Sequence, residues 1–160
     1  MNTNMDVYIF PDLVKKLSAR GLTLSCAESL TGGLLASSVV DVPGASKVFK
    51  GGFVTYCDEA KHSQLGVLKE TLKKDGAISE ETAREMAAGA AKALGTDIAI
   101  ATTGNAGPDA DEGKPVGLVY IGLYYQGNCQ AFCHHFTGTR KEIRLQTVRA
   151  AARHCMIMLQ

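Results

Sequence analysis

A short polar stretch, residues 25–33, holds the first side chains in the sequence that could take part in chemistry. It reads Ser-Cys-Ala-Glu-Ser-Leu-Thr-Gly-Gly and lies between an apolar run at 22–24 and a helix-like run at 34–40. Ser29 and Thr31 are residue types that cap helices, and a glycine pair lets a backbone or a ligand approach closely. The N–H groups of such a turn attract anions or a developing oxyanion. The stretch predicts one wall of an active site, although an ordinary cap with a flexible turn fits the same pattern.

Lys61 is the second candidate, because it falls in the first turn of a helix predicted to start with Asp58 as its cap and to run to about Leu65. The field at a helix N-terminus disfavours a lysine and lowers its pKa. A lowered pKa is what a lysine needs in order to act as a base. A solvated surface lysine is the alternative that the sequence leaves open.

Two arginines open the last predicted helix, which runs to about Leu159. Arg140 and Arg144 are four residues apart, so they share one face of that helix. Two positive charges at a helix N-terminus oppose its dipole, and an anionic ligand would relieve the conflict. Because Arg149 and Arg153 follow, a solvated basic face is the alternative.

Alternating strands and helices must position these side chains. Strands and helices alternate in the first two thirds of the chain and a hairpin comes late, which predicts one domain over residues 1–160, an α/β fold built as a three-layer α/β/α sandwich with a mixed sheet. The expected helices are 11–21, 34–40, 58–65, 70–76, 79–95 and 140–159, and the expected strands are 22–24, 48–56, 97–103, 116–124 and 130–136, with a hairpin turn at 126–128.

Three of these elements carry further expectations. Strand 48–56 contains the pair Gly51-Gly52, which is typical of a bulge or a close backbone approach. Strand 97–103 is expected to be central, and its carboxyl end leads into a glycine-rich loop, the place where open α/β sheets bind ligands. Helix 79–95 is expected to lie close against the sheet because its apolar stripe is mostly alanine: Ala83, Met86, Ala87, Ala90, Ala91 and Leu94.

Composition excludes several classes of protein. Hydrophobic residues make up 46% of the chain, charged residues make up 21%, and 17 basic residues nearly balance 16 acidic ones. A nearly neutral chain does not indicate a broad nucleic-acid or membrane footprint. No apolar run approaches the length of a membrane span, and residues 1–6 lack the pattern of a signal peptide, so a cytoplasmic protein is expected.

The cysteines suggest neither disulfides nor a metal centre. There are five of them, an odd number without a C-x-x-C pair, so free and mostly buried thiols are expected. The run from Cys129 through Cys133 to His134 and His135 invites a metal-site interpretation. It is disfavoured because four residues along a strand separate the two sulfurs by about 13 Å.

Four segments together resemble a known family. They are AESLTGG at 27–33, GFVTYCDEAK at 52–61, TGNAGP at 103–108 with KPVG at 114–117, and GTR at 138–140 with Arg144. In this order and spacing they resemble the CinA C-terminal domain family, the nicotinamide-mononucleotide amidases. The resemblance spans roughly 13–159. Larger members carry a further N-terminal domain, for which this sequence has no room, so a stand-alone form is expected.

The resemblance implies hydrolysis of the carboxamide of nicotinamide mononucleotide to nicotinate mononucleotide and ammonia. It implies Ser29 as the nucleophile, Lys61 as its general base and Tyr56 as a residue that orients one of them. The N–H groups of the turn formed by Thr31, Gly32 and Gly33 are then the expected donors to the oxyanion.

The resemblance also assigns the remaining substrate contacts. Thr103 and Gly104 are expected to line the pocket, and Arg140 with Arg144 is expected to hold the 5′-phosphate. No metal and no organic cofactor are implied. The expected partner is a small pyridine nucleotide, with no nucleic acid and no membrane. A homodimer or higher homo-oligomer is expected from the apolar region 49–53 and the alanine-rich helix.

The sequence departs from the family pattern at three places. Residues 109–112 read Asp-Ala-Asp-Glu where the family usually has a glycine pair, Asn105 stands where an aliphatic residue is usual, and Thr139 replaces a common aspartate. Added acidity beside a phosphate site is unfavourable. A non-catalytic nucleotide-binding or interaction protein on the same fold is therefore the alternative function.

Overall fold

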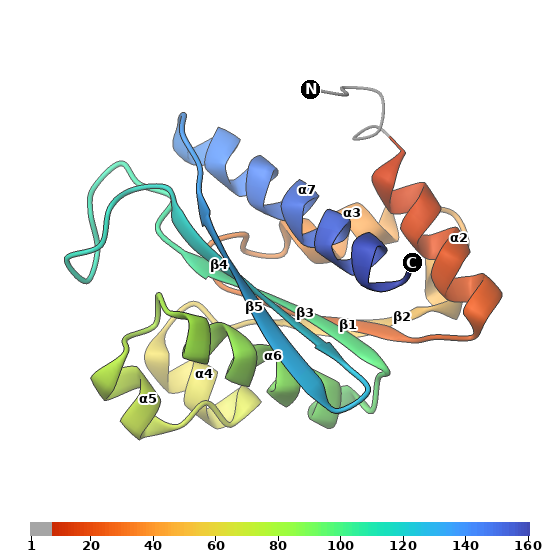
Figure 1. The fold of residues 1–160 in the computed structure, drawn as a ribbon, viewed down its shortest axis with the longest axis horizontal. Helices are drawn as coiled ribbons and strands as arrows, with labels where there is room; N and C mark the ends of the chain where they lie inside the picture. Colours follow the sequence, from red (N-terminus) through yellow and green to blue (C-terminus); the bar gives the residue numbers. More distant parts are fainter. Residues whose placement is uncertain (1–7) are drawn as a thin grey trace.

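The computed structural model describes residues 8–160 as a five-stranded mixed sheet between two layers of helices (Figure 1). This is the three-layer sandwich expected from the sequence. The strands are β1 (Leu24–Glu28), β2 (Phe49–Val54), β3 (Ile98–Gly104), β4 (Leu118–Tyr125) and β5 (Asn128–His135). The helices are α2 (Ile9–Arg20), α3 (Leu34–Val40), α4 (Asp58–Leu65), α5 (Lys69–Lys74), α6 (Glu80–Leu94) and α7 (Arg140–Met158), with a 3₁₀ turn, η1, at Ala45–Lys47.

The sheet has the strand order β2-β1-β3-β4-β5. Strands β2, β1 and β3 are parallel, whereas β4 and β5 run antiparallel to their neighbours. Strand β3 occupies the centre and is buried along all but its last residue, as expected for residues 97–103. Because β1, β2 and β3 are parallel, their carboxyl ends meet at one edge of the sheet.

Helices cover both faces of the sheet. Figure 1 shows α2, α3 and α7 on one face and α4, α5 and α6 on the other. The larger core forms under the first layer, where Leu13, Leu35 and Ile143 pack against Ile100 and Ile121. The smaller core lies under α6 and consists largely of alanine.

Close packing of α6 explains its alanine stripe. The Cβ of an alanine at position 122 in β4 would lie 2.1 Å from the carbonyl oxygen of Ala83, so only glycine lets helix and strand approach this closely. The expected stripe is buried except for Leu94, which is 36% exposed at the end of the helix. The stripe therefore ends one turn earlier than the periodicity indicates.

Strand β2 has both features that its glycine pair predicted, a bulge and a close approach of two backbones. Pairing with β1 shifts by one residue between Leu24 and Ser25, which places a bulge at Lys50. A Cβ at Gly52 would lie 2.4 Å from the sulfur of Cys26, so the strands approach closely there.

Two predicted helix caps are wrong. The N-cap of α3 is Gly33, and the N–H groups of Leu35 and Ala36 donate to the carboxylate of Glu28 (2.7 and 3.1 Å) rather than to Ser29 or Thr31. Glu28 is fully buried at the end of β1, directly below the start of the helix. The N-cap of α4 is Cys57, and Asp58 is the first helical residue.

The cysteines are all free, as expected, but only Cys26 and Cys155 are buried. Within residues 8–160 no helix has the length and hydropathy needed to cross a membrane. Residues 1–6, for which no signal peptide is expected, lie outside the described part of the chain.

Replacing Glu28 tests the buried cap. Glu28→Gln is expected to lower the free energy of unfolding by about 1–3 kcal/mol, because an amide presents one oxygen to two donors and its NH₂ group has no acceptor there. Urea unfolding followed by circular dichroism measures the loss. Glu81→Gln is the control, an exposed carboxylate in the first turn of α6. Equal effects for both variants would contradict the role of Glu28.

Replacing Gly122 tests the contact between helix and sheet. Gly122→Ala is expected to cost at least about 3 kcal/mol, because a backbone carbonyl cannot move aside without displacing α6. Thermal or urea unfolding measures this cost. Gly127→Ala, at a hairpin turn with open space around the glycine, carries only local backbone strain of about 1 kcal/mol. A cost at Gly122 no larger than at Gly127 would refute the close-packing argument.

Candidate active site

The carboxyl ends of the three parallel strands bring the predicted site residues together. Ser29 directly follows β1, Tyr56 is the second residue after β2, and Gly104 ends β3. Helix α4 starts just after β2 and returns Lys61 to the same edge of the sheet. Topology alone therefore explains why residues far apart in the sequence share one region.

Ser29 and Lys61 form a hydrogen-bonded pair. The Nζ atom of Lys61 lies 3.2 Å from Oγ of Ser29 and donates to the carbonyl oxygen of Thr55 at 2.9 Å. The Lys61 side chain is 2% exposed, so it is not the solvated lysine that was the alternative. Ser29 is half-buried and keeps access to solvent. The pair has the spacing that proton transfer between a hydroxyl and an amine requires.

Burial lowers the pKa of Lys61 below its ordinary value, and the nearby negative charges of Asp58 and Glu112 partly oppose the effect. The direction agrees with the sequence-based expectation, but burial of the amine is the leading cause rather than the helix field. A buried amine without a carboxylate in contact favours its neutral form. Neutral Lys61 can accept the proton of the Ser29 hydroxyl while one of its N–H bonds still points at Thr55.

The turn after Ser29 offers backbone donors. Within the described chain, the N–H of Gly32 donates to the carbonyl oxygen of Ser29 (3.0 Å), whereas the N–H groups of Leu30, Thr31 and Gly33 have no intramolecular partner. Leu30 and Thr31 are buried, and buried N–H groups are rarely left unpaired. Two of the three expected oxyanion donors therefore remain available, Gly32 does not, and Leu30 is a further one.

Arg144 fixes the shape of this turn. Its Nε donates to the carbonyl oxygen of Leu30 and one Nη donates to that of Thr31, both at 2.9 Å. The Thr31 hydroxyl is in turn bonded to that of Thr102 at 2.7 Å. Arg144 therefore holds the turn through two of its five N–H donors, a structural role in addition to the expected contact with a phosphate.

Arg140 bridges two other segments of the site. One Nη donates to the carbonyl oxygen of Gly107 at 2.6 Å and the other to the hydroxyl of Tyr56 at 2.7 Å. Tyr56 is 61% exposed, and its hydroxyl bonds to Arg140 rather than to Ser29 or Lys61. Arg140 is thus the more accessible of the two arginines, beside a tyrosine at the rim of the site.

Thr103 and Gly104 have structural partners. The Thr103 hydroxyl donates to the carbonyl oxygen of Ala77 (2.6 Å), and a Cβ at Gly104 would lie 2.7 Å from the carbonyl oxygen of Leu118. Both residues lie at the carboxyl end of β3, but these contacts shape the edge of the sheet rather than present a free group to a substrate.

The acidic loop, in which residues 109–112 depart from the family pattern, is bonded to the segment before α6. Glu112 accepts from the N–H groups of Ala77 and Ile78 (2.9 and 3.1 Å), and the Lys114 amine donates to the carbonyl oxygens of Asp75 and Ile78. Burial would raise the pKa of Glu112, but these N–H groups and the Lys114 charge hold it below its ordinary value. The carboxylate is therefore ionised and already bonded.

Three residues of the site were missed from the sequence. They are Glu28, Thr55 and Thr102, which respectively cap α3, anchor the Lys61 amine and bond Thr31. Among the described residues, the Thr55 hydroxyl is the one buried side-chain oxygen or nitrogen without a partner. The sequence contained a signal for one of the three: Glu28 is a charged residue at the end of an apolar strand.

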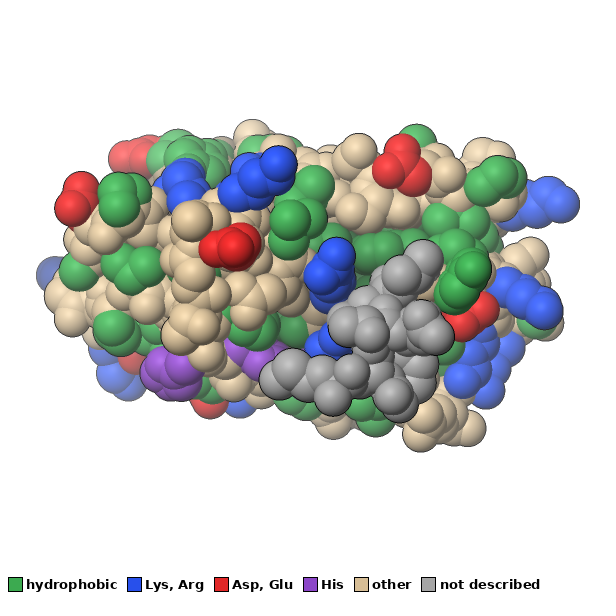
Figure 2. Space-filling view, turned by 90° about the horizontal axis from the view of Figure 1, so that it is seen from above, with side chains coloured by type: hydrophobic (Ala, Val, Ile, Leu, Met, Phe, Trp, Pro, Cys, Tyr) green, Lys and Arg blue, Asp and Glu red, His purple; other side chains and the backbone are tan. Residues whose placement is uncertain are grey.

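The cysteine–histidine run forms no metal centre with three ligands. Cys133 and His135 lie 3.8 Å apart, Sγ to Nε2, whereas His134 bonds His154 at 2.8 Å. Within residues 8–160 no group of three or more histidine, cysteine or acidic side chains could hold a metal ion. On the face seen in Figure 2, basic and acidic side chains are interspersed among apolar ones, with no field of a single sign.

Comparisons with known proteins agree with this architecture. The model of the CinA C-terminal domain matches residues 9–159. A CinA-like protein of Kosmotoga olearia is 54% identical over 133 residues, which are 82% of this chain but 32% of that protein. The chain thus spans about a third of the length of this curated relative.

Solved structures match over nearly their whole length. A competence/damage inducible protein, CihA, from Agrobacterium tumefaciens has a TM-score of 0.93 at 39% identity, covering 97% of this chain and 96% of that one. A CinA superfamily protein from Escherichia coli has a TM-score of 0.94 at 34% identity, covering 100% and 93%. The chain belongs to the CinA C-terminal domain family.

Proposed function

We propose that this protein is an amidohydrolase that converts nicotinamide mononucleotide to nicotinate mononucleotide and ammonia. The observation that carries the proposal is the contact between Ser29 and the buried amine of Lys61, with unpaired backbone N–H groups in the next two residues. A nucleophile, a base and oxyanion donors at one strand end are the parts that acyl transfer from an amide needs.

In the first half of the reaction, neutral Lys61 takes the proton of the Ser29 hydroxyl as Oγ attacks the carboxamide carbon. The N–H groups of Leu30 and Thr31 donate to the oxyanion that forms. When the C–N bond breaks, the Lys61 ammonium returns the proton to the leaving nitrogen. Ammonia departs and an acyl-serine remains.

In the second half, water attacks the acyl-serine and Lys61 again acts as the base. The C–Oγ bond breaks, Ser29 recovers its proton, and the carboxylic acid product leaves. Arg140 meets the phosphate of the substrate, since one of its Nη groups is held only by an exposed tyrosine hydroxyl. Arg144 contributes through the turn that it holds.

The altered loop is compatible with this function. Its acidic residue nearest to Lys61, Glu112, is bonded to two backbone N–H groups and lies near the Lys114 ammonium at 3.5 Å. The negative charge of Glu112, which favoured an inactive nucleotide-binding protein, therefore stabilises the segment before α6. A non-catalytic protein would differ from the amidohydrolase in one measurable property: it would bind the nucleotide without releasing ammonia.

Removing either member of the pair tests the mechanism. Ser29→Ala and Lys61→Met are each expected to reduce ammonia release from nicotinamide mononucleotide by at least about a thousandfold. A coupled ammonia assay with purified protein measures the rate. Lys61→Met also removes a buried amine, so its melting temperature is expected to be no lower than that of the wild type.

Two outcomes would contradict the proposal. Ammonia release that survives in the Ser29→Ala variant would exclude the acyl-serine route. A folded wild type that is stabilised by the nucleotide but releases no ammonia would favour the non-catalytic alternative. Lys15→Ala, an exposed lysine on α2, controls for the loss of a positive charge.

The pH profile tests the protonation state of Lys61. The rate is expected to rise with pH as Lys61 loses its proton, with an apparent pKa below the ordinary value for lysine. Asp58→Asn removes a negative charge that favours the ammonium form, so it should shift this limb to lower pH. Measuring kcat/KM across pH for both proteins tests the shift. A limb that stays in place, or moves to higher pH, would refute Lys61 as the base.

A further inference from the structure

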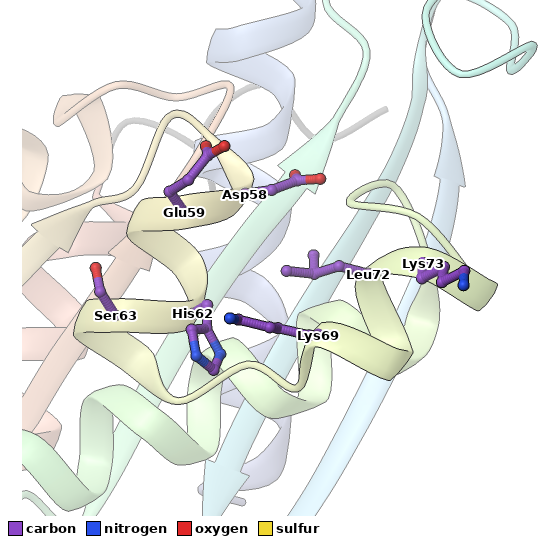
Figure 3. A pocket seen from close by; sticks show the side chains of 7 residues that line it. All are labelled: Asp58, Glu59, His62, Ser63, Lys69, Leu72 and Lys73. Carbon is purple, nitrogen blue, oxygen red and sulfur yellow. The ribbon is translucent and has the colours of Figure 1, made fainter.

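A cavity of about 610 Å³ lies between α4 and α5 (Figure 3), and neither Ser29 nor Lys61 is among the residues that line it. It is lined by residues from the outer side of α4, among them Asp58 and His62, and by Lys69, Leu72 and Lys73 of α5. Lys61 belongs to the buried side of the same helix. The cavity is large enough for a small metabolite, because ligand pockets have about 300–1,000 Å³.

The two walls of the cavity have opposite hydrogen-bonding character. The α5 wall donates, since Lys69 and Lys73 are one helical turn apart and each carries an ammonium group. The α4 wall mainly accepts, because Asp58 is a carboxylate at the start of the helix. Leu72 adds an apolar patch between them, and Figure 3 shows its side chain directed across the cavity.

His62 strengthens the accepting wall. Its Nδ1 lies 2.8 Å from the carbonyl oxygen of Val67, and a carbonyl can only accept, so Nδ1 carries the proton. In the neutral ring, Nε2 is then a free acceptor. The histidine thereby adds a second accepting atom to the carboxylate of Asp58, which lies one turn earlier on the helix.

The charged side chains on the two walls form no ion pair with one another or with other residues of the described chain. Neither Lys69 nor Lys73 forms an ion pair there, and the Asp58 carboxylate accepts no hydrogen bond from another residue. The walls face each other without closing, although opposite charges that could meet would gain from pairing. A ligand with an anionic end and a hydroxyl-rich end would satisfy both walls at once.

We propose that the cavity between α4 and α5 is a second, non-catalytic binding site for a sugar phosphate, such as the ribose phosphate part of a nucleotide. The ammonium group of Lys69, which Figure 3 shows directed toward His62, binds the phosphate, and Lys73 adds positive charge on the other side of Leu72. The sugar hydroxyls donate to Asp58 and to Nε2 of His62, and the apolar face of the sugar covers Leu72. An amino acid would also bridge two charges, but it is small for a cavity of this volume.

The site is separate from catalysis but shares a helix with it. Asp58 lines the cavity and also influences the charge state of Lys61. The inference does not depend on the amidase proposal, because it rests on a different set of side chains. Binding can therefore be tested without turnover.

Calorimetric titration with ribose 5-phosphate tests the site. We expect saturable binding to the wild type, with 1:1 stoichiometry in the Arg140→Ala variant, and we expect inorganic phosphate to bind more weakly and ribose weakest. Lys69→Ala/Lys73→Ala should weaken binding of ribose 5-phosphate by about tenfold or more, the loss expected for a charged hydrogen bond. Asp58→Asn should weaken binding of ribose 5-phosphate but not of inorganic phosphate.

Matched variants separate this site from the catalytic one. Lys15→Ala/Lys47→Ala removes the same charge from exposed positions outside the cavity and should bind like the wild type. Arg140→Ala removes the arginine proposed to meet the phosphate at the Ser29 site, so the ribose 5-phosphate that still binds to this variant is expected to occupy the cavity. Loss of binding in Arg140→Ala with full binding in the α5 double variant would place the ligand at the Ser29 site and overturn the proposal. Absence of binding, or binding that no variant changes, would overturn it as well.

Discussion

The burial of one lysine amine is the constraint on which the catalytic site depends. Lys61 is almost wholly enclosed, and its Nζ bonds to a hydroxyl and a carbonyl oxygen rather than to a carboxylate, so the charges of Asp58 and Glu112 offset the lost hydration only in part. Burial of this kind costs stability and favours the neutral amine. The fold tolerates the cost because two layers of helices and a packed sheet surround the site. A solvated lysine at the same position would remain protonated and could not serve as a base.

A neutral base is useful only if the nucleophile beside it is held still. The turn that carries Ser29 is fixed from three directions: Glu28 holds the helix that follows, Arg144 holds two carbonyl oxygens, and Thr102 holds the Thr31 hydroxyl. Arg144 lies more than a hundred residues away in the sequence, so α7 acts as a brace for the turn after β1.

The departures from the family pattern have structural reasons. Thr139 is the N-cap of α7 and forms a reciprocal capping box with Glu142, a role that an aspartate can also perform. Asn105 accepts from the N–H of Gly107 and donates to the carbonyl oxygen of Lys114, so it ties the start of the loop between β3 and β4 to the end of the same loop. Glu112 holds the segment before α6. Asp109 and Asp111, the other acidic residues of the altered loop, are exposed to solvent.

By itself, the sequence determined the order and type of the elements, the mixed three-layer fold and the family, because hydrophobic period, glycine position and motif spacing are local properties. It also pointed to Ser29 and Lys61 as a pair. Tertiary structure decided what each polar group contacts: the burial of Lys61, the brace by Arg144, the pairing of Tyr56 with Arg140, and the cap by Glu28. Those outcomes depend on which strand ends become neighbours and on how much water the packed helices exclude. Neither quantity is encoded in the spacing of residues along the chain.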